Sequence, residues 1–259
     1  MLIGGASLAG RRWGPAIGGW LVGLPLTSAP IAFFLARDHG LTFAAAAAVG
    51  IMAGTVSQAA FCVAYARTAV RAHWPLAVLA GSFAFALATL ALRWLPLSLV
   101  PLAAIAVLSL MLSTRLMPAL AASPRPAAPL PWWDLPARMV VTTGFVVLLT
   151  GVASLLGPRL TGLVTPFPLY GAMLSGFTHA LEGPARAAGV LRGLLLGLYC
   201  FTGFFFVLAA LLERAGIALA FTGATVVALV IQGLALWILR RGITSQRAAA
   251  PEPRSKALP

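Results

Sequence analysis

GPAIGGWLVGLPLTSAP, residues 14–30, returns in altered form as GPRLTGLVTPFPLYGAM, residues 157–173. The similarity extends beyond these segments, because residues 14–95 align with residues 157–238 at a constant offset of 143 positions and without a gap. Nineteen of the 82 aligned pairs are identical. Roughly 8 identities would be expected by chance in a chain so rich in Ala and Leu. The sequence therefore predicts two copies of one structural unit.

The composition is typical of a protein embedded in a membrane. Of the 259 residues, 61% are hydrophobic and only 9% are charged, which excludes an ordinary soluble core. Apolar stretches long enough to cross about 30 Å of hydrocarbon recur along the chain. Since lipid offers no water to backbone polar groups, each stretch is expected to be a helix with internal hydrogen bonds. The predicted fold class is all-α transmembrane, with the lipid bilayer as the main partner.

We predict eight transmembrane helices in two groups of four. Their ranges are 17–36, 41–66, 75–92, 97–114, 139–157, 160–181, 193–212 and 215–239. The first copy then occupies residues 1–114 and the second residues 139–241. Residues 115–138, rich in Pro and Ala, are expected to form a cytoplasmic linker, and residues 242–259 a disordered cytoplasmic tail.

Basic residues indicate the orientation of these helices. With both termini in the cytoplasm, 14 of the 18 Lys and Arg residues fall inside. The four that fall outside are Arg37, Arg93, Arg159 and Arg214. This positive-inside bias accounts for the net charge of +13 without a nucleic-acid partner. Five helices, an odd number, separate the start of one copy from the start of the other, so the copies are predicted to be inserted in opposite directions.

Inverted repeats are the plan of many secondary transporters, although a channel or a structural duplicate can share the symmetry. The first copy is incomplete in this scheme, because only residues 1–10 stand where the second copy has the helix 139–157. Either the start of the chain is truncated or the first copy has lost its opening helix. A signal peptide over residues 1–30 is the competing interpretation, and recurrence of the same pattern at residues 157–183 argues against it.

Matching interruptions mark the two copies, at residues 23–30 and at residues 166–172. Proline removes a backbone donor and frees a carbonyl one turn earlier. Helices interrupted at equivalent positions of two halves indicate a central substrate site. Proline kinks also occur in membrane helices without any site, and this alternative stays open. The candidate substrate-binding residues are Pro25, Thr27, Ser28, Gln58, Thr165, Pro168 and Tyr170.

Two small-residue motifs also correspond between the copies. Gly50 and Gly54 form a Gly-xxx-Gly pair in the first copy, and Gly193 and Gly197 form its equivalent in the second. Such pairs let two helix backbones approach closely. We expect these glycines to pack the helices 41–66 and 193–212 against each other or against the interrupted helices.

Residues suited to catalysis or metal binding are few. All five acidic residues fall in loops, in the tail or at the ends of predicted helices, so no carboxylate offers a proton relay in mid-membrane. No metal-ligand cluster or phosphate-binding loop is found, and we expect neither a metal nor a cofactor. Ser175 and His179 share a helix face, but no acid is placed to orient the histidine. We therefore expect no enzymatic activity, and an intramembrane enzyme is the least favoured class.

Several short motifs of the second copy are shared with a known family: Gly162-Leu163, Phe167-Pro168, His179, Gly183 and Gly193. In these motifs the copy resembles the GlpM-type small membrane proteins. The first copy departs from the pattern, with Leu24-Pro25 in place of Phe-Pro and Ala36 at the position of the histidine. The resemblance implies a bacterial inner-membrane location and little about activity. The paired inverted units are also similar in plan to drug/metabolite-type transporters.

Together these features favour a small secondary transporter or permease for a neutral or weakly anionic solute. The alternative is a non-transporting membrane scaffold or assembly protein that binds partners through its glycine faces and basic loops. Interrupted helices that pack tightly, with no polar cavity between them, would favour the scaffold. A homo-oligomer is compatible with either function.

Overall fold

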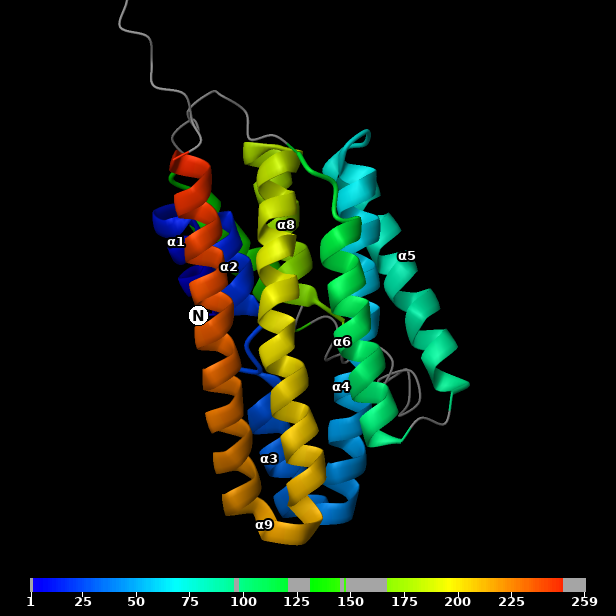
Figure 1. Cartoon of the computed structure of the whole chain (residues 1–259). Coiled ribbons are helices and arrows are strands. Elements are labelled where there is room, and N and C mark those ends of the chain that lie inside the picture. The colour runs from blue at the N-terminus through cyan, green and yellow to red at the C-terminus, as the bar shows by residue number, and fades with distance from the viewer. Residues whose placement is uncertain (1, 96–97, 121–130, 145–146, 148–166, 249–259) are drawn as a thin grey trace, which may run out of the picture.

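The computed structural model describes residues 2–95, 98–120, 131–144, 147 and 167–248 of the chain, which are helical and contain no strand. The named helices are α1 (Leu2–Trp13), α2 (Pro15–Val22), α3 (Ser28–His39), α4 (Leu41–Ala69), α5 (Trp74–Arg93), α6 (Leu99–Leu116), α8 (Leu169–Glu182) and α9 (Pro184–Ala248) (Figure 1). Residues 134–144 are helical as well and are called the 134–144 helix below. The all-helical prediction is thus confirmed over the described residues.

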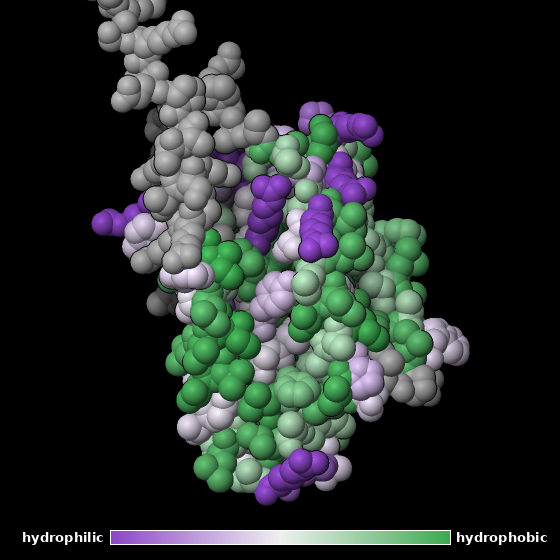
Figure 2. All heavy atoms as spheres, viewed as in Figure 1, coloured by the Kyte–Doolittle hydropathy of each residue, from purple (hydrophilic) through white to green (hydrophobic). Residues whose placement is uncertain are grey.

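Four helices of the described chain are long and apolar enough to cross a membrane: α4, α5, α6 and α9. The long α9 is not straight, because Gly216 has φ 75° and ψ 177° and divides it into two legs. These legs lie side by side and meet at the lower end of the bundle in Figure 1. Hydrophobic residues cover most of the face drawn in Figure 2, and hydrophilic residues gather toward its two ends. The fold is that expected of a membrane-embedded protein.

Three of the other predicted spans are not seen as single continuous helices among the described residues. The span 17–36 is two short helices, α2 and α3, with residues 23–27 between them. The span 139–157 is described only as far as residue 147, and the span 160–181 only from residue 167. Within the linker predicted over residues 115–138, α6 continues to Leu116 and the 134–144 helix already begins.

The two ends of the chain are more helical than predicted. Residues 2–13, expected to be the remnant of an opening helix, form the 12-residue α1, which packs against α2. At the other end, α9 extends to Ala248, into the stretch predicted to be a disordered tail from residue 242. The remainder of that stretch, residues 249–259, lies outside the described residues.

Helix boundaries recur at the offset of the sequence repeat. α3 ends just before Gly40, which has φ 90° and ψ 167°, and α8 ends just before Gly183, which has φ 91° and ψ 172°. These glycines stand 143 positions apart, and α4 and α9 begin directly after them. Both lie in a backbone region that is essentially restricted to glycine. The chain therefore turns from one helix into the next with the same backbone conformation in both copies.

Replacing Gly40 or Gly183 with alanine is expected to lower the free energy of unfolding by about 1–3 kcal/mol, because a side chain forces this backbone conformation into strain. Open space surrounds both positions, so the cost is conformational and should be similar in the two copies. Thermal unfolding in detergent measures the effect. The same substitution at Gly50, a helical glycine with nothing within 4 Å of a new Cβ, is the control and should stabilise slightly. Equal behaviour of all three variants would contradict the prediction.

α4 lies at the centre of the bundle, where it packs against α5, α6 and α9. Its side chains Phe61 and Tyr65 are fully buried, as is Phe205 of the facing leg of α9. Hydroxyl groups join the same helices, since Thr202 of α9 donates to the Leu198 carbonyl and lies 3.3 Å from the Thr55 hydroxyl of α4. Apolar packing with a few buried polar links is the usual way in which helices associate in lipid.

α2 packs against the first leg of α9 more closely than side chains allow. A Cβ on Gly19 would lie 1.8 Å from the Val190 carbonyl oxygen, and one on Gly193 would lie 1.8 Å from the Ala16 carbonyl oxygen. One turn further along, Gly23 and Gly197 are in similarly close backbone contact, with a Cβ on Gly23 2.5 Å from the Gly197 Cα. We call the four residues Gly19, Gly23, Gly193 and Gly197 the glycine seam.

Candidate functional site

The interruption between α2 and α3 places a helix start partway along the bundle (Figure 1). Pro25 is buried there, and its carbonyl accepts a hydrogen bond from the Ala29 amide at 2.9 Å, in the turn that leads into α3. In the second copy the Pro168 carbonyl accepts from the Ala172 amide at 2.7 Å, at the start of α8. The two donors stand 143 positions apart, and so do the two acceptors. The same backbone bond is therefore present at both interruptions, although α8 begins two repeat positions earlier than α3.

A cavity of about 310 Å³ lies beside these two helix starts. α1 contributes Leu2, Gly5 and Ala6, and the end of α2 with the interruption contributes Leu21, Val22, Leu24, Leu26 and Thr27. Tyr170, in the first turn of α8, completes the lining. Its two polar side chains are those of Thr27 and Tyr170, and the rest is apolar.

Thr27 and Tyr170 are equivalent positions of the repeat, because they stand 143 residues apart. The structure thus brings together two of the seven candidate substrate-binding residues, one from each copy. A hydroxyl can both donate and accept a hydrogen bond, so the pair can bind one polar group of a small molecule. The apolar walls suit the remainder of such a molecule.

The other candidate residues lie outside the lining of this cavity. Pro25 and Pro168 are buried at the helix starts, and Ser28 is the first residue of α3. Gln58 is buried on α4, where it is 8% exposed. Thr165 lies outside the described residues.

The equivalent glycine motifs differ in their surroundings. Gly193 and Gly197 belong to the glycine seam, in contact with the backbone of α2. A Cβ on Gly50 would have no atom within 4 Å, and Gly54 is buried on α4. Close backbone packing is therefore found at the motif of the second copy.

Ser175 donates a hydrogen bond within its own helix, and His179 contacts α4. The Ser175 hydroxyl donates to the Gly171 carbonyl oxygen at 2.7 Å, within its own helix. His179 is 9% exposed, and its Nδ1 lies 3.3 Å from the Tyr65 hydroxyl of α4. Because the serine proton is engaged by the backbone, the geometry does not favour activation of a nucleophile by this histidine. Among the described residues, no group of three His, Cys, Asp or Glu side chains could hold a metal ion.

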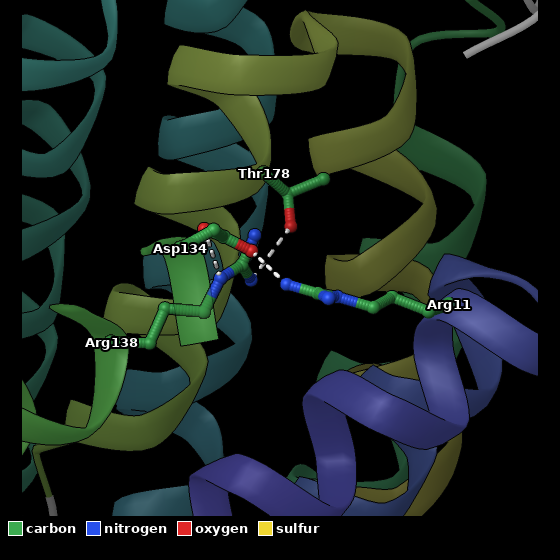
Figure 3. A network of polar contacts seen from close by, with 4 residues as sticks. All are labelled: Arg11, Asp134, Arg138 and Thr178. Carbon is green, nitrogen blue, oxygen red and sulfur yellow. Dashed lines mark hydrogen bonds and ion pairs between the residues drawn. The ribbon is translucent and has the colours of Figure 1, made fainter. Parts of the chain in front are cut away.

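A buried ion-pair network is the feature that sequence reasoning missed (Figure 3). Asp134 binds two arginines through its two carboxylate oxygens, Arg11 from the end of α1 and Arg138 one turn along the 134–144 helix. The Arg138 Nε lies 2.8 Å from the Asp134 Oδ1, and its Nη1 lies 3.4 Å from the Thr178 hydroxyl of α8. The Arg138 guanidinium also lies 5.4 Å from the centroid of the Phe177 ring, in cation–π contact. We call Arg11, Asp134 and Arg138 the ion-pair network.

Part of this network could have been predicted. Asp134 and Arg138 are four residues apart, the spacing of an ion pair on a helix. The Pro- and Ala-rich surroundings instead indicated a surface linker. The side chains of Asp134 and Arg138 are only 0% and 3% exposed, whereas charged side chains of a surface linker would be exposed to solvent. The third member, Arg11, lies 123 residues away from Asp134, and nothing in the sequence connects the two.

No protein-family model, curated protein or solved structure was found to match this chain.

Proposed function

We propose that the protein is a small secondary transporter of a bacterial inner membrane, with its substrate site in the cavity between Thr27 and Tyr170. One observation carries the proposal: equivalent hydroxyl residues of the two copies line one cavity of about 310 Å³ at the interrupted helices. Transporters built from inverted repeats bind their substrates at such a position, between interrupted helices of the two halves.

The helix directions support an inverted repeat. α4 and the first leg of α9 begin at equivalent positions, 41 and 184, and run in opposite directions along the bundle (Figure 1). α3 and α8, which precede them, also run in opposite directions. In this scheme the chain crosses the membrane eight times, with α2 and α3 together forming one crossing.

The distribution of charge supports an orientation. α1, α4 and α6 carry Arg11, Arg67 and Arg115 in their last turns, at the upper end of the bundle in Figure 1. We call this the basic end. Basic residues are enriched on the cytoplasmic side of membrane proteins, so the basic end faces the cytoplasm in our proposal.

The cavity lining indicates the class of substrate. Seven of its nine residues are aliphatic or glycine, and the other two supply hydroxyl groups. A small molecule with an apolar body and one polar or weakly anionic group fits this lining. The volume of about 310 Å³ is at the lower end of the range for small-molecule sites.

Reconstitution into liposomes tests this function. Uptake of labelled aliphatic monocarboxylates, aliphatic alcohols and neutral amino acids is measured against protein-free vesicles. We expect facilitated flux of at least one class and a loss of about tenfold when Thr27→Val and Tyr170→Phe are combined, since two hydrogen bonds to substrate are removed.

Matched substitutions outside the cavity serve as controls. Thr222→Val and Tyr199→Phe make the same chemical changes on α9, away from the lining residues, and should leave flux unchanged. If the Thr27 and Tyr170 variants fold normally and every flux stays at the level of the unmodified protein, the site assignment is wrong.

If the protein were a scaffold, the interrupted helices would be expected to pack tightly together. A cavity between them, with a hydroxyl from each copy, favours transport instead. Absence of flux for every solute class, together with stable capture of a partner protein through the basic loops, would favour the scaffold.

A further inference from the structure

We propose that the ion-pair network is the cytoplasmic gate of the cavity: it closes the route from the basic end of the bundle to Thr27 and Tyr170. This inference rests on the proposed function and adds a mechanism of access to it. α1, which lines the cavity, also carries Arg11 of the network, and α8, which lines it too, carries Thr178, which accepts a hydrogen bond from Arg138.

The network lies directly along these helices from the cavity. α1 contributes Ala6 to the cavity and Arg11 to the network, five residues further on. α8 contributes Tyr170 to the cavity and, eight residues further on, Thr178, which accepts from Arg138. At a rise of 1.5 Å per residue, these separations place the network about 8–12 Å from the cavity. A solute that leaves the cavity along α1 and α8 toward the basic end therefore meets the network.

A second, much smaller space lies between the two. It measures about 20 Å³ and is lined by Ser7, Gly10, Arg11, Pro15, Gly18, Arg138, Leu174, Thr178, Glu182 and Val190. A space of this size accommodates about one water molecule, which is too little for a solute. α1, α2 and α8 line both this space and the larger cavity. The two spaces share these three helices but no lining residue, so a route between them is closed in this structure.

A polar group without a partner lines the smaller space. The hydroxyl of Ser7 on α1 is buried and has no hydrogen-bond partner among the described residues. A buried hydroxyl left unpaired is costly, and water entering the route would satisfy it. The constricted state therefore leaves a polar group unpaired that a hydrated, open route would pair.

The charges of the network can be stable in both states. With the route closed, Asp134 pairs with both Arg11 and Arg138, and its own side chain is fully buried. With the route open, water would solvate the three charges, and a buried ion pair costs desolvation that hydration returns. The Arg11 bond is the part that links α1 to the 134–144 helix, because Asp134 and Arg138 belong to the same helix. Arg11 is also 33% exposed at its side chain, so it can separate from Asp134 without opening the protein core.

Cysteine labelling from the cytoplasmic side tests the gate. Thr27→Cys places a thiol in the cavity, and the native Cys62 and Cys200 are buried, so the unmodified protein provides the background. In inverted membrane vesicles, a membrane-impermeant maleimide should label the introduced thiol slowly when the network is intact. Adding Arg11→Gln should raise the labelling rate at least tenfold, whereas Arg11→Lys, which keeps the charge, should restore slow labelling.

The control breaks a polar contact of another arginine at the same end of the bundle. Arg67→Gln removes the hydrogen bond from the Arg67 Nε to the Leu116 carbonyl oxygen, which joins α4 to α6 and involves neither the network nor the lining of either space. This variant should change the labelling rate less than twofold. Asp134→Asn is the second test, because it removes the acceptor that Arg11 and Arg138 share, and it should also raise the rate at least tenfold.

Unchanged labelling in folded Arg11→Gln and Asp134→Asn proteins would overturn the gate, as would equal acceleration by Arg67→Gln. Labelling measures access and liposome flux measures transport, so the two proposals fail separately. Faster labelling in a protein that moves no tested solute would retain the gate and count against transport. If flux is facilitated but the labelling rate is the same with and without an intact network, the transporter proposal stands and the gate proposal is wrong.

Discussion

Gly193→Ala is expected to destabilise the protein severely, whereas Gly50→Ala, the equivalent change in the first copy, should stabilise it slightly. A methyl group on Gly193 would lie 1.8 Å from the Ala16 carbonyl oxygen and 2.6 Å from its carbonyl carbon. Both are backbone atoms and cannot move away by a change of rotamer, so α2 as a whole must shift away from α9. Overpacking at a rigid contact costs about 3 kcal/mol or more. At Gly50 no atom lies within 4 Å, and alanine gains about 0.5–1 kcal/mol over glycine within a helix.

Unfolding in mixed detergent micelles, followed by circular dichroism, measures both changes in one experiment. The comparison is well matched, because the two glycines share a motif, a helix interior and a repeat position. Gly19→Ala, on the other side of the glycine seam, should behave like Gly193→Ala, since its Cβ would lie 1.8 Å from the Val190 carbonyl oxygen. Similar unfolding curves for the Gly50 and Gly193 variants would show that α2 and α9 do not pack in this way.

Gly5→Phe is expected to abolish transport while leaving the fold intact. Gly5 lines the cavity, and a Cβ built on it has no atom within 4 Å, so a larger side chain has room to enter. A phenyl ring in a space of about 310 Å³ would exclude a solute of comparable size. We expect flux to fall by more than tenfold and the unfolding temperature to stay within a few degrees, because no packed atom is displaced.

Gly233→Phe is the control for this substitution. Gly233 is an exposed residue of α9, and a Cβ there also has no atom within 4 Å. Flux through this variant should equal that of the unmodified protein. Normal flux through a folded Gly5→Phe protein would move the substrate site out of the cavity. Equal loss in both variants would point to a general effect of an added aromatic side chain.

The interruptions show how far the repeat alone could lead. An offset of 143 residues makes Pro25 equivalent to Pro168, and in the structure each carbonyl accepts a hydrogen bond from the amide four residues further on. The same offset makes Thr27 equivalent to Tyr170, but equivalence along the chain is not proximity in space. Their meeting in one cavity depends on how α8 and α1 lie against the end of α2. That arrangement is a property of the packed bundle.

The ion-pair network shows the opposite limit. The distribution of charged residues among the loops predicted a topology. In that prediction Asp134 was part of a surface linker. In the structure Asp134 is fully buried between two arginines, one of them 123 residues earlier in the sequence. Local composition does not report burial, because a charged residue next to prolines reads the same way at a surface and within an interface. The glycine motifs show the same limit, since Gly50 and Gly193 are equivalent in sequence and only Gly193 contacts a second backbone.

The amino-acid sequence by itself determined that this chain forms apolar helices, because lipid leaves each backbone amide and carbonyl to be satisfied within its own segment. It also determined where the interruptions and joints fall, since proline and the positive-φ glycines act on the backbone locally. Only the tertiary structure decided which surfaces meet: the glycine seam, the cavity of Thr27 and Tyr170, and the bond from Arg11 to Asp134. These are contacts between residues more than 100 positions apart, and such contacts follow from the packing of whole helices rather than from any local pattern.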